Sequence, residues 1–491
     1  MCEQIHLRFN LEGPSIWQAF EAAAPGGHAS ATALLHHRLH ETSCCEPEHY
    51  NDDEQLGGAI NEAVLWSRVA YGIPEGLGAL SRALAELDND GKVRDAGAIP
   101  FSVLHVEQLD LGKVHLDKTA VIGAAGLVIL SRALRKLVLC ANAAVVDDGA
   151  QALAAGLEGN GTLLELDLSK CGIAAAGGVA LGRAIGANKA LQKLSLGGNN
   201  LLRDASVKTV AAGLEGNGTL LELDLSECGI GAAGGVALGR AIGANKALQK
   251  LNLKMNKELK DEGAQALAAG LEGNGTLLEL DLGECGIAAA GGVALGRALS
   301  ANRALQKLGL WGNSCLEGPG ITASLAAGLG CNGTLIELNV MACFVGAAGA
   351  AALGKALGSN KALQTLLLFA EEALEDEGVA ALALALEGNT TLLDLKLQFC
   401  GVTAASGAAL GRVLRINKAL QKLDLCDNNQ LKDDGIAELA AGLESNTTLL
   451  ELQLAACGIA VAGGAALGRA LSANKALQKL ILNGNSGMKD E

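Results

Sequence analysis

A pattern of leucines that returns every 57 residues or so constrains this chain more than any other feature of its sequence. The segment from Leu163 to Ile173, which reads LLELDLSKCGI, recurs with a cysteine at the same step in every later copy. These cysteines are Cys171, Cys228, Cys285, Cys343, Cys400 and Cys457, at successive spacings of 57, 57, 58, 57 and 57 residues. A repeated unit of this size cannot bury its own apolar face, so neighbouring units must stack. We therefore expect one extended repeat structure rather than several globular domains.

A second unit lies between the cysteine units and ends in asparagine. The segment Leu191–Asn199 reads LQKLSLGGN, and its last step is Asn142, Asn256, Asn313, Asn428 or Asn485 in other copies, with Glu371 as a departure. Both units read L-x-x-L-x-L-x-x-N/C-x-L, which is the leucine-rich repeat pattern. The alternating pair resembles the ribonuclease-inhibitor type, and also the repeat region of NOD-like receptors of the NLRC3-like kind. The resemblance covers about residues 109–491.

The resemblance implies an α/β solenoid, a leucine-rich-repeat horseshoe with parallel strands on the concave face and helices on the convex face. The residues agree, because alternate leucines of each short segment point inward and the residues between them face solvent. Stretches such as Asp261–Leu271 carry apolar residues at helical spacing after acidic starts. With 66 glycines and only 2% aromatic residues, we expect small side chains to let the helices approach closely.

Outside the repeats, residues 1–60 show no period, and we expect a flexible segment. Histidines and cysteines between His28 and His49 lack the spacing of a zinc site, which favours a solvated tail. We expect residues 61–108 to form a degenerate repeat that caps the array, and residues 109–491 to form the repeats. Met488–Glu491 aligns with Leu259–Glu262, where a helix should follow, so we expect the repeats to be truncated at the C-terminus.

Several function classes are disfavoured by composition. All eight histidines lie at or before His115, and no nucleophile-elbow, zinc-protease, C-x-x-C or phosphate-loop motif occurs, so we expect no enzyme, no metal and no cofactor. A net charge of −15 argues against nucleic acid as a partner. The longest apolar stretch, Ala120–Leu130, is too short to span a membrane, and the N-terminus lacks a secretory signal. We therefore expect a cytoplasmic protein.

Three ladders of equivalent residues have both a structural and a chemical interpretation. Equivalent cysteines lie two strands apart, roughly 9.5 Å, which is too far for a disulfide and favours buried packing. The tripeptides that begin at Asn160, Asn217, Asn274, Asn332, Asn389 and Asn446 resemble glycosylation sites, but their repeat spacing favours a helix-to-strand turn. The third strand position alternates between acidic residues and lysine, which predicts a rail of ion pairs, with a binding rail as the alternative.

Candidate binding residues lie where the copies differ on the strand face. The fifth strand position is acidic in the early cysteine units, at Asp110, Asp167, Asp224 and Asp281. The seventh position becomes large and apolar later, at Trp311, Met341 and Phe369, with Phe399 nearby. We predict a protein–protein interaction scaffold or regulator whose acidic half attracts a basic partner and whose apolar patch anchors it on the concave face. Local packing that covers these side chains is the alternative interpretation of the patch, and a Ran-type GTPase-activating protein is the alternative function.

Overall fold

The computed structural model describes residues 7–9, 106–314 and 319–487, with short gaps between residues 114 and 130. Its contacts divide the chain into two units, Met1–Cys171 and Gly172–Glu491. The expected N-terminal segment 1–60 and the cap at 61–108 lie outside the described residues except for 7–9 and 106–108, as do the last four residues. The domain boundaries therefore stay predictions.

The first unit contributes four described strands and one helix. Its described elements are β1 (Leu7–Phe9), β2 (Val106–Asp110), β3 (Lys136–Val138), α6 (Val146–Gly159) and β4 (Glu165–Asp167). Strand β1 runs antiparallel to β2, whereas β2, β3 and β4 are parallel and in register, so that Leu109, Leu137 and Leu166 are partners. These three leucines are buried, as the inward position of the repeat predicts.

The second unit alternates one helix with one parallel strand along its whole length. Its helices are α7 (Ala175–Ala187), α8 (Arg203–Glu215), α9 (Ala232–Ala244), α10 (Lys260–Glu272), α11 (Ala289–Ala301), α12 (Pro319–Cys331), α13 (Gly346–Ser359), α14 (Glu375–Leu386), α15 (Ala404–Ile416), α16 (Lys432–Glu444) and α17 (Val461–Ala473). Its strands are β5 (Lys193–Ser195), β6 (Glu222–Asp224), β7 (Lys250–Asn252), β8 (Glu279–Asp281), β9 (Lys307–Gly309), β10 (Glu337–Asn339), β11 (Thr365–Leu367), β12 (Asp394–Lys396), β13 (Lys422–Asp424), β14 (Glu451–Gln453) and β15 (Lys479–Ile481). A short 3-10 helix, η2 (Glu372–Leu374), precedes α14.

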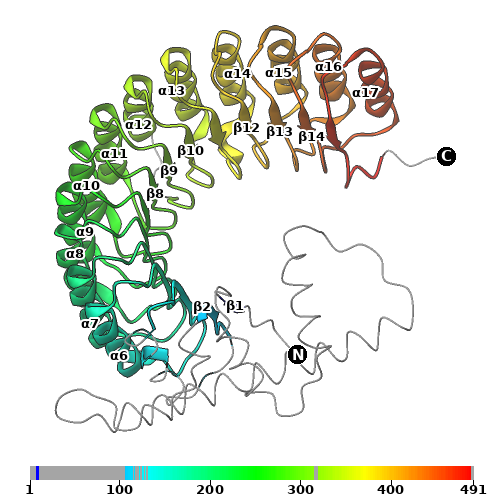
Figure 1. The fold of residues 1–491 in the computed structure, drawn as a ribbon. Helices are drawn as coiled ribbons and strands as arrows, with labels where there is room; N and C mark the ends of the chain where they lie inside the picture. The colour runs from blue at the N-terminus through cyan, green and yellow to red at the C-terminus, as the bar shows by residue number, and fades with distance from the viewer. Residues whose placement is uncertain are drawn as a thin grey trace, which may run out of the picture. The chain divides into compact units, whose positions relative to one another are not determined.

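Within the second unit, the strands line the inner side of the curve and the helices line its outer side (Figure 1). Each strand pairs in register with the next, so the central leucines face the helices as a continuous stack, for example Leu251, Leu280 and Leu308. All three are at most 2% exposed. The α/β solenoid expected from the repeat is confirmed. None of the described helices is both long enough and apolar enough to cross a bilayer.

Glycine sets how closely the helices pack. A Cβ at Gly182 of α7 would lie 2.6 Å from the Val210 nitrogen of α8, and a Cβ at Gly213 of α8 would collide with the Gly182 carbonyl oxygen. The same collision recurs between Gly270 of α10 and Gly239 of α9. The close approach expected from the glycine content is thus confirmed, and it explains a core that needs few aromatic residues.

The cysteine and asparagine ladders hold the turns together. Cys285 is buried and free, and its Sγ donates to the Leu253 carbonyl oxygen at 3.1 Å. Asn256 Oδ1 accepts from the amides of Cys228 and Ile230, both at 3.0 Å. Asn274, from a glycosylation-like tripeptide, is 4% exposed and donates to the Ile242 carbonyl oxygen at 2.7 Å. The packing and turn interpretations are therefore confirmed.

Candidate protein-binding surface

The hydrogen-bonded ladder of the second unit continues beyond the ends of its strands. Gly312 N donates to the Met341 carbonyl oxygen at 2.8 Å, and Ala342 N donates to that of Phe369 at 2.9 Å. Seventh-position residues of neighbouring units therefore lie on adjacent rungs, about 4.8 Å apart. Because the rungs are adjacent, Trp311, Met341 and Phe369 follow one another just beyond the carboxyl ends of β9, β10 and β11.

Trp311 is held by the glycine of the preceding unit. A Cβ at Gly283 would collide with the indole of Trp311, so the ring lies over the rung where the repeat has no side chain. Trp311 is consequently half-buried, neither fully solvent-facing nor covered. Neighbour packing covers part of this ring, as the alternative interpretation expected, and leaves the rest accessible.

Phe369 and Phe399 form an aromatic pair on the next two units. Their ring centroids are 5.7 Å apart with an interplanar angle of 83°, an edge-to-face arrangement. Phe399 is 45% exposed, and Met341 and Phe369 are half-buried. We call Trp311, Met341, Phe369 and Phe399 the apolar row.

Phe344, which our sequence reasoning missed, lies close in sequence to Met341 on the turn between β10 and α13 and is 50% exposed. Comparing the repeats at strand positions five and seven could not reveal Phe344. It directly follows the ladder cysteine, at a position where the other cysteine units have glycine.

The fifth-position acids have a structural role that the sequence did not reveal. In the first unit, Oδ1 of Asp110 accepts from the Gly112 amide and Oδ1 of Asp167 from the Ser169 amide, both at 2.9 Å. In the second unit, Asp224 and Asp281 do the same for the residues two positions after them, again at 2.9 Å. Each acid thus fixes the turn at the end of its strand with one oxygen.

The charged third position forms the predicted ion pairs over part of its length. Lys136 pairs with Glu165 at 3.0 Å in the first unit. In the second unit the pairs are Lys193–Glu222 at 3.4 Å, Lys250–Glu222 at 4.0 Å, Lys250–Glu279 at 3.5 Å, Lys307–Glu279 at 3.4 Å and Lys479–Glu451 at 2.7 Å. Among the described residues, the rail is interrupted from Glu337 to Lys422, where Thr365 breaks the alternation of charge. Within the described part of the chain, no lysine or arginine pairs with Asp224 or Asp281, although Lys254 stands at the seventh position of the β7 rung between them.

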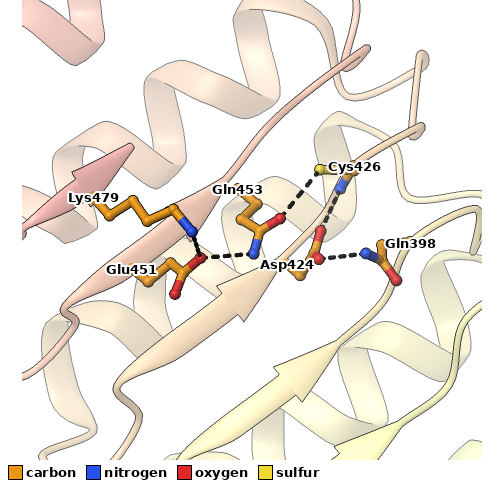
Figure 2. Close-up of polar contacts among 6 residues, drawn as sticks. All are labelled: Gln398, Asp424, Cys426, Glu451, Gln453 and Lys479. Carbon is orange, nitrogen blue, oxygen red and sulfur yellow. Dashed lines mark hydrogen bonds and ion pairs between the residues drawn. The ribbon is translucent and has the colours of Figure 1, made fainter. Parts of the chain in front are cut away.

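Polar side chains replace the apolar row toward the C-terminal strands, as Figure 2 shows. Gln398 donates to Asp424, whose Oδ1 accepts from the Cys426 amide at 3.0 Å. On the next strand, Gln453 donates to Glu451 at 2.8 Å, and Lys479 also binds Glu451. These contacts hold each polar side chain in place and end the apolar row at Phe399.

The described cysteines of this surface offer no nucleophile. Burial raises the pKa of the Cys426 thiol to about 12, and that of Cys400 to about 12 as well. Both thiols therefore stay protonated at neutral pH. No group of three or more metal-ligating side chains occurs among the residues that the structure describes.

Comparison with known proteins identifies relatives along the repeats. A family model described as "Leucine Rich repeat" matches residues 159–182, 216–239, 244–268, 273–296 and 445–468. The chain is 31% identical to the ribonuclease inhibitor of Mus musculus over 325 residues, 65% of this chain and 70% of that protein. It is 34% identical to NACHT, LRR and PYD domains-containing protein 5 of Homo sapiens over 310 residues, 62% of this chain.

The alignment spans only 25% of the length of that human protein. Among solved structures, the complex of Rad7 and Elc1 from yeast matches with a TM-score of 0.46 and 16% identity, over 90% of this chain and 96% of that one.

Proposed function

Because the chain belongs to the ribonuclease-inhibitor type of the leucine-rich repeat family, we propose that it binds another protein on the strand face of its second unit. The apolar row anchors the partner, and Asp224 and Asp281 attract a basic surface on it. In this proposal the chain is a non-catalytic, cytoplasmic scaffold or regulator. The likeness of its repeats to a ribonuclease inhibitor supports the binding role.

One observation carries this proposal: Trp311, Met341 and Phe369 stand at the seventh position, where earlier rungs of the unit have Gly197, Ser226, Lys254 and Gly283, and Phe399 follows one step later on the next rung. Phe399 is 45% exposed and the other three are half-buried, so each retains surface that a partner can cover. Clusters of partly exposed aromatic side chains are typical of the residues that dominate binding energy. The polar rungs on either side suit the rim of such an interface.

Charge gives the second part of the proposal. One oxygen of Asp224 and one of Asp281 accept from a main-chain amide, and Asp224 Oδ2 also accepts from the Ser195 hydroxyl at 3.4 Å, but no described cation neutralises either acid. Carboxylates of this kind speed association with a basic partner more than they strengthen the complex, because their effect acts at long range and is screened by salt.

Two double variants test the proposal. The partner is first identified by capture from native lysate, and a purified ribonuclease is the first probe because of the name of the Mus musculus relative. Trp311→Ala with Phe369→Ala should weaken binding at least about 30-fold, since loss of one hot-spot residue costs about 2 kcal/mol. Asp224→Asn with Asp281→Asn should lower mainly the association rate and its salt dependence.

Leu384→Ala is the matched control, because Leu384 lies on α14, on the helix side, and is 66% exposed. It should leave binding unchanged. If the aromatic double variant keeps its circular dichroism spectrum and binds as tightly as the native chain, the apolar row is not the anchor.

The Ran-type GTPase-activating function stays a prediction that no feature of the described residues favours. A GTP hydrolysis assay with a panel of small GTPases separates it from the binding function. Stimulated hydrolysis by the native chain would replace the scaffold proposal with the catalytic one.

A further inference from the structure

Phe344 occupies a backbone position that the repeat reserves for glycine. In the other described cysteine units this step is glycine with a positive φ, at Gly172, Gly229, Gly286, Gly401 and Gly458. Phe344 has φ 54°, in the left-handed region that a bulky side chain rarely adopts. The surrounding structure must offset the strain of a residue held there.

The unit has changed around Phe344 in a way that accommodates a side chain. At Gly229 a Cβ would lie 2.5 Å from the Asn200 carbonyl oxygen, and at Gly286 it would collide with that of Lys257. The residue at the matching step of this unit is Glu372, and it begins the 3-10 helix η2 instead of the usual loop. The only 3-10 helix assigned among the described residues of the second unit thus coincides with the missing glycine.

A third departure fixes the same turn. Glu371 replaces the ladder asparagine and is 1% exposed. Its Oε1 accepts from the Cys343 amide at 2.5 Å and its Oε2 from the Val345 amide at 2.7 Å. These amides lie immediately before and after Phe344, so the carboxylate clamps the residue on both sides. In the regular units a single asparagine oxygen accepts both bonds.

These three departures do not serve the core, because Phe344 is 50% exposed. A strained backbone that presents a large apolar ring to solvent is a feature of binding sites. Phe344 follows Met341 of the apolar row by three residues on the same turn, and the rungs of that row from Trp311 to Phe399 span about 14 Å.

We propose that Phe344 is a partner-contacting residue, a rim anchor beside the apolar row, that receives an apolar side chain of a peptide segment flanked by lysine or arginine. The inference rests on the proposed function and adds both a contact and the chemistry of the partner segment. The basic flanks follow from charge: Asp281 lies one rung before Trp311, and Asp427 lies on the turn of the rung after Phe399. No cation pairs with these two acids within the part of the chain that the structure describes.

Short peptides selected from a displayed library on the native full-length chain are the probe, and their affinities are measured by fluorescence anisotropy. Phe344→Gly should weaken them roughly tenfold or more while thermal stability stays the same or rises, because glycine relieves the left-handed strain. Phe344→Ala should weaken them equally without that gain in stability. Leu384→Ala should change neither.

The outcomes separate the two proposals. If Trp311→Ala with Phe369→Ala abolishes binding but Phe344→Gly and Phe344→Ala bind as the native chain does, the rim anchor is refuted and the proposed function stands. If none of these variants weakens binding, both are refuted. A fall in thermal stability of Phe344→Gly would show that the ring serves the fold, and selected peptides with acidic flanks would refute the stated chemistry.

Discussion

Glu371 makes a pH-dependent contribution to stability that one substitution can remove. Burial raises the pKa of this carboxyl from 4.5 to about 7, although hydrogen bonds from the Cys343 and Val345 amides act in the opposite direction. In the regular ladder, Asn313 also donates through Nδ2 to the carbonyl oxygens of Leu282 and Leu310. An ionised Glu371 cannot donate in this way, whereas the amide of Glu371→Gln can.

The sign of the effect follows from linkage. A carboxyl whose pKa is raised on folding binds its proton more tightly in the native state, so the contribution of Glu371 to stability is highest below pH 4.5 and falls as the pH rises to about 7. The raised pKa corresponds to about 3 kcal/mol lost above pH 7. Glu371→Gln should therefore be more stable than the native chain at pH 8, and the difference should shrink steadily toward pH 5.

Urea unfolding followed by circular dichroism between pH 5 and pH 8 measures this difference. Glu377→Gln is the control, because Glu377 is exposed at the start of α14 and makes the same chemical change without burial. The pH-dependent difference of Glu371→Gln beyond that of Glu377→Gln measures the effect of burial. A stability difference for Glu371→Gln that stays constant across this pH range would refute the account of a buried, protonating carboxyl.

Two further predictions concern the repeat itself. Gly182→Ala should destabilise the chain by about 1–3 kcal/mol in urea, because its Cβ would lie 2.6 Å from the Val210 nitrogen, whereas Gly216→Ala, in open space, should be close to neutral; equal effects would contradict the packing argument. Alkylation at pH 8 with mass spectrometric mapping should label the exposed Cys331 much faster than Cys285, because burial raises the Cys285 pKa to about 12; similar rates would contradict a buried ladder.

The fold was predictable because every level of the sequence pattern agrees. The spacing of Leu251, Leu280 and Leu308 sets the strand register, and the asparagine and cysteine ladders satisfy the turns between strands and helices. Repetition makes such signals strong, since each unit confirms the next. The roles of buried thiols and glycosylation-like asparagines followed from the same spacing.

The candidate surface was only partly predictable, because it depends on the orientation of side chains and on how they pack against each other. The sequence places Trp311 and Phe369 on neighbouring rungs, but it does not show that the indole lies over Gly283 or that Phe369 meets Phe399 edge to face. The acids at Asp224 and Asp281 were predicted as attraction sites, yet each also fixes its own turn through one oxygen. A sequence pattern gives the type and position of each residue, but not which oxygen atoms of a carboxylate already accept hydrogen bonds.

The departure at Glu371 was visible in the sequence, but its meaning was not. The sequence alone does not connect Glu371 with Phe344, because the two residues lie in different copies of the repeat. Only the hydrogen bonds to the amides on both sides of Phe344 connect them.

Amide hydrogen exchange of the chain with and without its bound partner tests the central claim most directly. Binding at the strand edge of the second unit predicts slowed exchange in the turns that follow β9 to β12, around residues 310–314, 340–345, 368–371 and 397–400. Protection confined to the helices α7–α17, with these turns unchanged, would contradict the account.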